Sequence, residues 1–197
     1  MPPVLEKKEA SHPAIKPGIS LDGGPIRLNL GGMGEGFVDG TIEGFLTVDL
    51  RPGADIQCDC SDLEFMKDKS VDAIYASNIL EHWPMESTIP VLKEWRRVLK
   101  PKGRLYISVP DFDVAVKMYQ KTGLTRWLRF HLWGDQKHIL NYHYTCFTLA
   151  TLSKDLIDAG FSDVKRVKKW PFEVSDGSQN VDTACGYLIS LNVEAIN

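Results

Sequence analysis

The chain has few cysteines, no long hydrophobic run and no large excess of charge of either sign. Its four cysteines lack the spacing of a disulfide framework, which predicts a cytoplasmic protein. No apolar run is long enough to span a bilayer, and no signal-peptide pattern is found. A net charge of −3 argues against a dedicated nucleic-acid-binding protein. With 197 residues and 43% hydrophobic content, one globular domain with its own core is expected.

Proline content separates the start of the chain from the rest. Residues 1–24 carry four prolines and a charged EKKE run, a composition that opposes a regular helix. They predict a loosely ordered N-terminal arm, and the domain itself is expected over 25–197.

From residue 25 on, apolar runs alternate with turns and helical patterns. We expect strands at about 26–30, 45–50, 54–58, 71–77 and 104–109, helices over about 85–99 and 148–159, and two last strands near 164–170 and 183–191. Strands that alternate with helices predict a parallel α/β sheet, whose ligands bind at the carboxyl ends of the strands.

The segment LNLGGMGEG, residues 28–36, is a glycine-dense turn that follows an apolar run, and Asp49 ends the next apolar run. Glycine lets a backbone turn sharply and approach a ligand closely. A carboxylate at the end of the following strand can accept both hydroxyls of a ribose. Because Phe37 stands at the third position of the dinucleotide pattern GxGxxG, a nucleoside cofactor without phosphates is favoured.

Polar residues also follow the later strands. Asp59 follows the third, Ser77 and Asn78 the fourth, and Asp111 the fifth. Each alone is typical of a helix cap or a turn. Together they indicate a site at one edge of the sheet.

The strings LNLGGMGEG, VDL, CDCSDLEF, VDAIYASNILEHW and WRRVLKPKGRLYISVP resemble the class I S-adenosylmethionine-dependent methyltransferases, of the type 11-like kind. GDQKHILNYHYTCFTLATLSKDLIDAGF is similar to the C-terminal segment of predicted methyltransferases from polysaccharide or cell-surface gene clusters. The resemblance covers about 25–170. It implies a Rossmann-like, mostly parallel α/β sheet of about seven strands with an antiparallel last strand. It also implies an enzyme that takes a methyl group from S-adenosylmethionine and leaves S-adenosylhomocysteine.

The resemblance assigns cofactor contacts to these residues: Asn29, Gly31, Gly32, Met33, Gly34, Asp49, Leu50, Asp59, Cys60, Ser77 and Asn78. Asp49 would hold the ribose hydroxyls, Asp59 the adenine amino group, and the Cys60 N–H an adenine ring nitrogen. The glycines would lie under the methionine portion. Two positions depart from the family: Asn29 stands where it has an acid, and Met33 where it has a glycine unless the loop shifts by one.

Methyl transfer requires alignment of the acceptor, exclusion of water and, for an oxygen or nitrogen acceptor, a nearby base. His82 is the first candidate because it follows the fourth strand, and His143 and Asp111 are the next. A histidine in LEHW can equally well bond a backbone group and pack.

Residues 111–146 are expected to form an insertion rich in aromatic residues and histidines. It could serve as a lid or a carbohydrate platform, or as the core of a small subdomain. No metal is expected, because neither Cys58 with Cys60 nor the group His131, Asp135, His138 and His143 has paired zinc-site spacing.

The expected partner is therefore a small-molecule or glycan acceptor. Nucleic acid is not expected, since the basic residues between 93 and 104 are typical of a solvated helix face. A homodimer is compatible with the sequence. Two alternatives stay open: a degenerate methyltransferase fold that binds a ligand or partner, and a dinucleotide or nucleotide-sugar enzyme.

Overall fold

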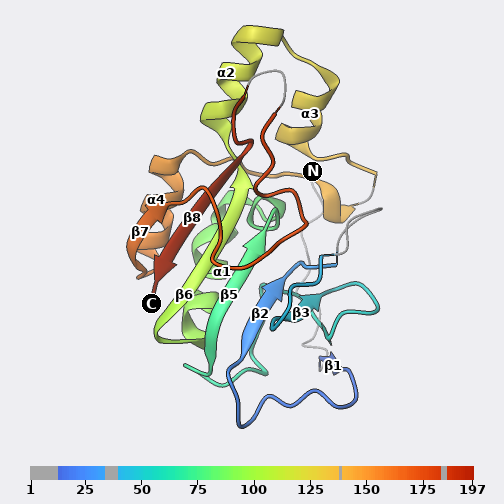
Figure 1. Ribbon diagram of the computed structural model, residues 1–197, viewed down its shortest axis with the longest axis vertical. Helices are drawn as coiled ribbons and strands as arrows, with labels where there is room; N and C mark the ends of the chain where they lie inside the picture. The colour runs from blue at the N-terminus through green and yellow to red at the C-terminus, as the bar shows by residue number, and fades with distance from the viewer. Residues whose placement is uncertain (1–12, 34–39, 138, 183–185) are drawn as a thin grey trace.

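The protein is built around an eight-stranded sheet in the order β1-β4-β3-β2-β5-β6-β8-β7 (Figure 1). This computed structural model describes residues 13–33, 40–137, 139–182 and 186–197. The strands are β1 (Ala14–Ile15), β2 (Arg27–Leu30), β3 (Leu46–Asp49), β4 (Ile56–Gln57), β5 (Val71–Ser77), β6 (Leu99–Pro110), β7 (Ser162–Arg166) and β8 (Ser190–Ile196).

The predicted mostly parallel α/β sheet with an antiparallel last strand is confirmed. Strands β2 to β6 pair in parallel, and β8 runs antiparallel to both of its neighbours, β6 and β7. Strand β2 lies between β3 and β5, so the strand order reverses direction there. Such a reversal opens a crevice at the carboxyl ends of the strands, where ligands of doubly wound sheets bind.

Helices α1 (Thr88–Val98) and α4 (Leu149–Asp158) cover one face of the sheet (Figure 1). Alternate strand residues such as Leu28, Ile74 and Ile107 point toward these helices and form the larger core with them. Trp95 of α1 is fully buried there, and its indole N–H donates to the Cys60 carbonyl at 2.8 Å. The same helix therefore supports the segment that follows β4.

The opposite face is covered by the loop of residues 167–182, which crosses β5 and β6 in Figure 1. Tyr75 and Tyr106 on the strands pack against Trp170 and Phe172 of this loop. The Tyr75 hydroxyl and the Trp170 indole N–H both bond the Ser178 hydroxyl, at 2.9 and 3.0 Å. An aromatic cluster thus replaces the helices usually found on this face.

The prediction for the last strand is wrong in position, since β8 begins at Ser190 instead of about 183. The chain turns at Gly186, whose φ is +72°, and Asn180 and Ile189 are joined by a backbone hydrogen bond before β8 starts. Within the predicted range, residues 186–189 precede β8, and Leu188 forms an isolated antiparallel bridge with Val181. Part of the predicted arm also joins the sheet, because β1 pairs with β4.

The insertion predicted at 111–146 contains α2 (Phe112–Thr122), α3 (Arg126–Trp133) and the short 3-10 helix η3 (Ile139–Asn141). Helices α2 and α3 stand beyond the carboxyl ends of β5 and β6 (Figure 1). The Phe112 N–H donates to the Phe147 carbonyl at 3.0 Å, so the segment leaves and returns at neighbouring points. Across the described ranges, no helix has the length and apolar character needed to cross a membrane.

Candidate active site

The glycine turn after β2 is tightly packed. Gly31 has φ +70°, and its N–H donates to the Val48 carbonyl at 2.8 Å. A Cβ at Gly31 would press on Ile79, and one at Gly32 would overlap the Asn29 amide. Both glycines are therefore required by local packing, whatever the turn binds. Gly34 lies outside the described residues.

Asn29 is buried in β2, and its side-chain N–H donates to the Gly40 carbonyl at 2.6 Å. The amide thus joins β2 to Gly40, four residues beyond the glycine-dense segment 28–36. This bond uses Nδ2, whereas an ammonium group of the cofactor could be bound only by Oδ1, because an ammonium donates and does not accept.

Asp49 ends β3 with its carboxylate almost completely engaged. The Arg51 guanidinium binds it in a bidentate manner, at 3.0 Å to Oδ1 and 2.9 Å to Oδ2. The backbone N–H groups of Arg51 and Met33 donate to the same two oxygens. Asp49 is 6% exposed, and both oxygens that would receive ribose hydroxyls have donors. Sequence reasoning missed Arg51, although an arginine two residues after the acid was a usable signal.

The segment after β4 presents the next two predicted residues. Asp59 is exposed, and its Oδ1 accepts from the Ser61 N–H and hydroxyl at 2.8 and 2.7 Å. Cys60 is buried, with its thiol donating to the Val48 carbonyl at 3.3 Å. Burial raises the pKa of the Cys60 thiol well above its usual value, so the thiol is a packing group. Leu50, after β3, is exposed.

Ser77 and Asn78 end β5 beside the glycine turn. Asn78 adopts φ +49°, a conformation that asparagine tolerates better than most residues. Its backbone N–H donates to the Ser108 carbonyl of β6 at 2.8 Å, and its side chain donates to the Ser77 hydroxyl at 3.2 Å. This turn directs the chain immediately into the 3-10 helix η1 (Leu80–His82).

Three titratable groups meet just beyond Asn78. Glu81 and His82 belong to η1, and His143 comes from the segment after η3. The imidazole rings of His82 and His143 have centroids 4.9 Å apart, and His143 Nε2 lies 4.0 Å from Glu81 Oε1. The structure thus brings together two of the predicted catalytic residues, with a carboxylate that sequence reasoning missed.

Glu81 is fully buried, and neither carboxylate oxygen meets a hydrogen-bond donor from another described residue. This desolvation raises the pKa of Glu81 to about 8. Burial, followed by the neighbouring His82, lowers the pKa of His143 to about 4. A carboxylate next to His82 in LEHW was the available signal, but the sequence does not reveal that its side chain faces inward.

Asp111 bonds residues outside the Glu81, His82 and His143 cluster. Its side chain is fully buried and caps α2 by accepting from the Val114 N–H at 3.2 Å. Its other oxygen accepts from the Arg166 guanidinium at 2.6 Å. Both oxygens are therefore bonded to structural partners, and a catalytic role of Asp111 stays a prediction.

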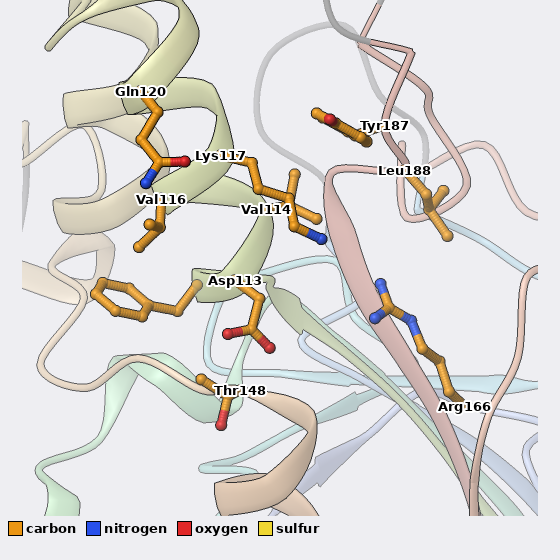
Figure 2. A pocket seen from close by; sticks show the side chains of 10 residues that line it. Asp113, Val114, Val116, Lys117, Gln120, Thr148, Arg166, Tyr187 and Leu188 are labelled. Carbon is orange, nitrogen blue, oxygen red and sulfur yellow. The ribbon is translucent and has the colours of Figure 1, made fainter.

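An open groove of about 710 Å³ lies between α2 and β7 (Figure 2). Lys117 and Arg166 contribute its positive charges, and the Lys117 ammonium lies 5.8 Å from the Tyr187 ring centre. The groove shares no lining residue with the predicted cofactor contacts. It is a feature of the insertion side of the sheet, next to the Asp111 cap.

Comparisons with known proteins give a consistent result. Residues 45–107 match the family model described as a methyltransferase domain, a range that begins after the glycine turn and contains Asp49, Asn78, Glu81 and His82 but not His143. A search of curated proteins finds no match.

Solved structures share the fold at low sequence identity. A SAM-dependent methyltransferase from Archaeoglobus fulgidus is 15% identical, with 90% of this chain and 88% of that chain covered and a TM-score of 0.54. A SAM-dependent methyltransferase from Thermotoga maritima is 19% identical, with 88% and 83% covered and a TM-score of 0.54. The Burkholderia thailandensis 1,6-didemethyltoxoflavin-N1-methyltransferase, solved with S-adenosylhomocysteine, is 19% identical, with 88% and 71% covered and a TM-score of 0.50.

These neighbours establish the fold, and the family match adds the activity class of the central region. The chain therefore has the class I fold of S-adenosylmethionine-dependent methyltransferases, and its residues 45–107 match a methyltransferase domain.

Proposed function

We propose that this protein transfers the methyl group of S-adenosylmethionine to an oxygen or nitrogen of a small-molecule or glycan acceptor. The observation that carries the proposal is the position of Asp49, Cys60 and Asn78, which end or follow neighbouring strands on both sides of the point where the strand order reverses. All three lie within the matched methyltransferase region.

The residues present fit the cofactor with one rearrangement. Asp49 would accept the ribose hydroxyls after the Arg51 side chain moves away, which is feasible because Arg51 is about one-third exposed. Asp59 has an exposed carboxylate near the adenine end, with Oδ1 held by Ser61. Asn78, at the carboxyl end of β5, would line the methionine end.

The acceptor would lie between Asn78 and the insertion of residues 111–146. The cofactor supplies a methyl group that is already activated by its sulfonium, so the chain mainly orients the acceptor and excludes water. His82 and His143 would receive the acceptor proton, and the lowered pKa of His143 keeps that imidazole neutral at pH 7. Exposed aromatic residues of the insertion, such as Trp127 and Trp133, offer flat surfaces for a sugar ring.

Calorimetry with S-adenosylmethionine and S-adenosylhomocysteine tests the cofactor assignment. We expect both to bind the wild-type protein and Asp49→Asn to weaken both at least tenfold, because the neutral amide is a poorer acceptor for two hydroxyls. Asp62→Asn, an exposed acid near Asp59, is the matched control and should bind normally. If neither compound binds, the result would favour a non-enzymatic binding protein.

His82 provides the test of turnover. We expect His82→Ala to leave cofactor affinity unchanged and to lower methyl transfer at least tenfold, since it removes one imidazole of the cluster. The measurement is transfer of labelled methyl groups to a panel of glycan and small-molecule acceptors, together with calorimetry on the same variant. Unchanged turnover would remove His82 from the mechanism.

A further inference from the structure

The buried carboxylate of Glu81 is the least satisfied polar group in the described part of the chain. Both oxygens are inaccessible, and neither has a hydrogen-bond partner among those residues. Burying a polar group without compensation costs several kcal/mol. A proton or a bound cation must therefore offset this cost in the folded protein.

The two neighbouring histidines are oriented in the way that metal ligands are. His82 Nδ1 lies 3.0 Å from the Tyr142 carbonyl, and His143 Nδ1 lies 3.1 Å from the His131 carbonyl. A carbonyl oxygen only accepts, so each Nδ1 carries the proton and each Nε2 keeps its lone pair. Metal-binding histidines almost always donate their second ring N–H to such a partner, which fixes the tautomer.

The ligand atoms of Glu81, His82 and His143 all lie within 4.8 Å of one another. In a tetrahedral site with bonds of about 2.0–2.1 Å, ligand atoms are spaced by about 3.3 Å, so closure around an ion requires movements of about 1 Å. Two histidines and one glutamate form a known zinc set that leaves the fourth position open. The partly exposed imidazoles of His82 and His143 offer a path of entry.

We propose that Glu81, His82 and His143 bind one divalent transition-metal ion, with Zn²⁺ as the best match to two imidazoles and a carboxylate. The ion would fasten the segment carrying His143 to η1, at the carboxyl end of β5. The sequence predicted no metal from the spacing of Cys58 with Cys60 and of the histidines between 131 and 143, and it does not reveal this set, in which His143 lies 61 residues beyond His82. A bound ion would use the Nε2 lone pairs of both histidines, so in the metal-bound protein His82 and His143 would hold this segment and would not receive the acceptor proton. Metal binding is measured directly and does not depend on the methyl-transfer proposal.

The experiment titrates Zn²⁺ into the full chain after chelator treatment, followed by calorimetry. We expect one equivalent to bind with micromolar or tighter affinity. Glu81→Gln, which keeps the shape of the side chain, should weaken binding at least tenfold, and His143→Ala should do the same. Glu86→Gln, an exposed carboxylate of the next 3-10 helix, is the matched control and should bind like the wild type.

Two further measurements test whether the ion binds at Glu81, His82 and His143. Co²⁺ bound at this site should show ligand-field bands without thiolate charge-transfer absorption, which separates it from binding at cysteine. Hydrogen exchange of residues 139–145 should accelerate when the metal is removed, because the segment loses its attachment to η1. Failure of the wild-type protein to bind Zn²⁺, or equal binding by Glu81→Gln and His143→Ala, would overturn the proposal and leave Glu81 as a protonated acid.

Discussion

Arg51 occupies the carboxylate on which ribose recognition would depend. Its guanidinium covers both oxygens of Asp49 from a position two residues along the chain. The arginine stabilises a nearly buried charge. Under the proposed function it would compete with the ribose hydroxyls for the same oxygens.

Removing this competitor should strengthen cofactor binding. We expect Arg51→Met, which keeps the length of the side chain without its charge, to tighten S-adenosylmethionine binding about two- to tenfold, the range implied by a partly exposed ion pair. Calorimetry measures the change, and Arg96→Met on α1 serves as a control for loss of charge. Weaker binding by Arg51→Met would instead indicate that Arg51 contacts the cofactor.

Elements with strong periodicity were predictable, and those stabilised by distant contacts were not. Strand β5 coincides with the run VDAIYAS, because its residues are buried on both faces of the sheet. The covering loop has no such pattern, since its order comes from Trp170 and Phe172 packing on Tyr75 and Tyr106. The same holds for the candidate site. The residues at the strand ends were predictable from the alternation of strands and helices, whereas the inward direction of the Glu81 side chain follows only from the turn at Asn78.

We expect the stability of the covering loop to depend on the Tyr75 hydroxyl, and removal of this hydroxyl tests the expectation. Its hydroxyl bonds Ser178 at 2.9 Å and Asp176 at 2.5 Å. We expect Tyr75→Phe to lower the free energy of unfolding by about 1–2 kcal/mol, because the partly buried Asp176 carboxylate loses a donor and the buried Ser178 hydroxyl loses one of its partners. Tyr106→Phe is the matched control, since the Tyr106 hydroxyl bonds none of the residues that the structure describes. Urea denaturation measures both, and equal losses would show that the loop does not depend on this hydroxyl.

At the scale of the whole molecule, two aspartates join strands that the sequence separates. Asp72 in β5 accepts from the Ile26 N–H at 2.8 Å and pairs with Lys100 of β6 at 2.8 Å. Asp55 accepts from the Thr47 N–H of β3 at 3.0 Å. Partial burial alone would raise the pKa of both carboxyls, but these hydrogen bonds outweigh it and lower the pKa of each.

A lowered pKa in the folded state fixes the direction of the pH dependence. The unfolded chain binds protons at higher pH than the folded protein does, so the stabilisation is complete above the ordinary aspartate pKa of about 4 and is lost as the pH falls below it. We expect Asp72→Asn to reduce the free energy of unfolding at pH 7 by about 0.5–1 kcal/mol, the usual range for partly exposed pairs, and to flatten the decline between pH 4 and pH 2. Asp68→Asn, an exposed acid, serves as the comparison variant. Urea denaturation across this range measures the effect, and an acid limb as steep in Asp72→Asn as in the wild type would show that Lys100 and Ile26 do not favour the charged carboxylate.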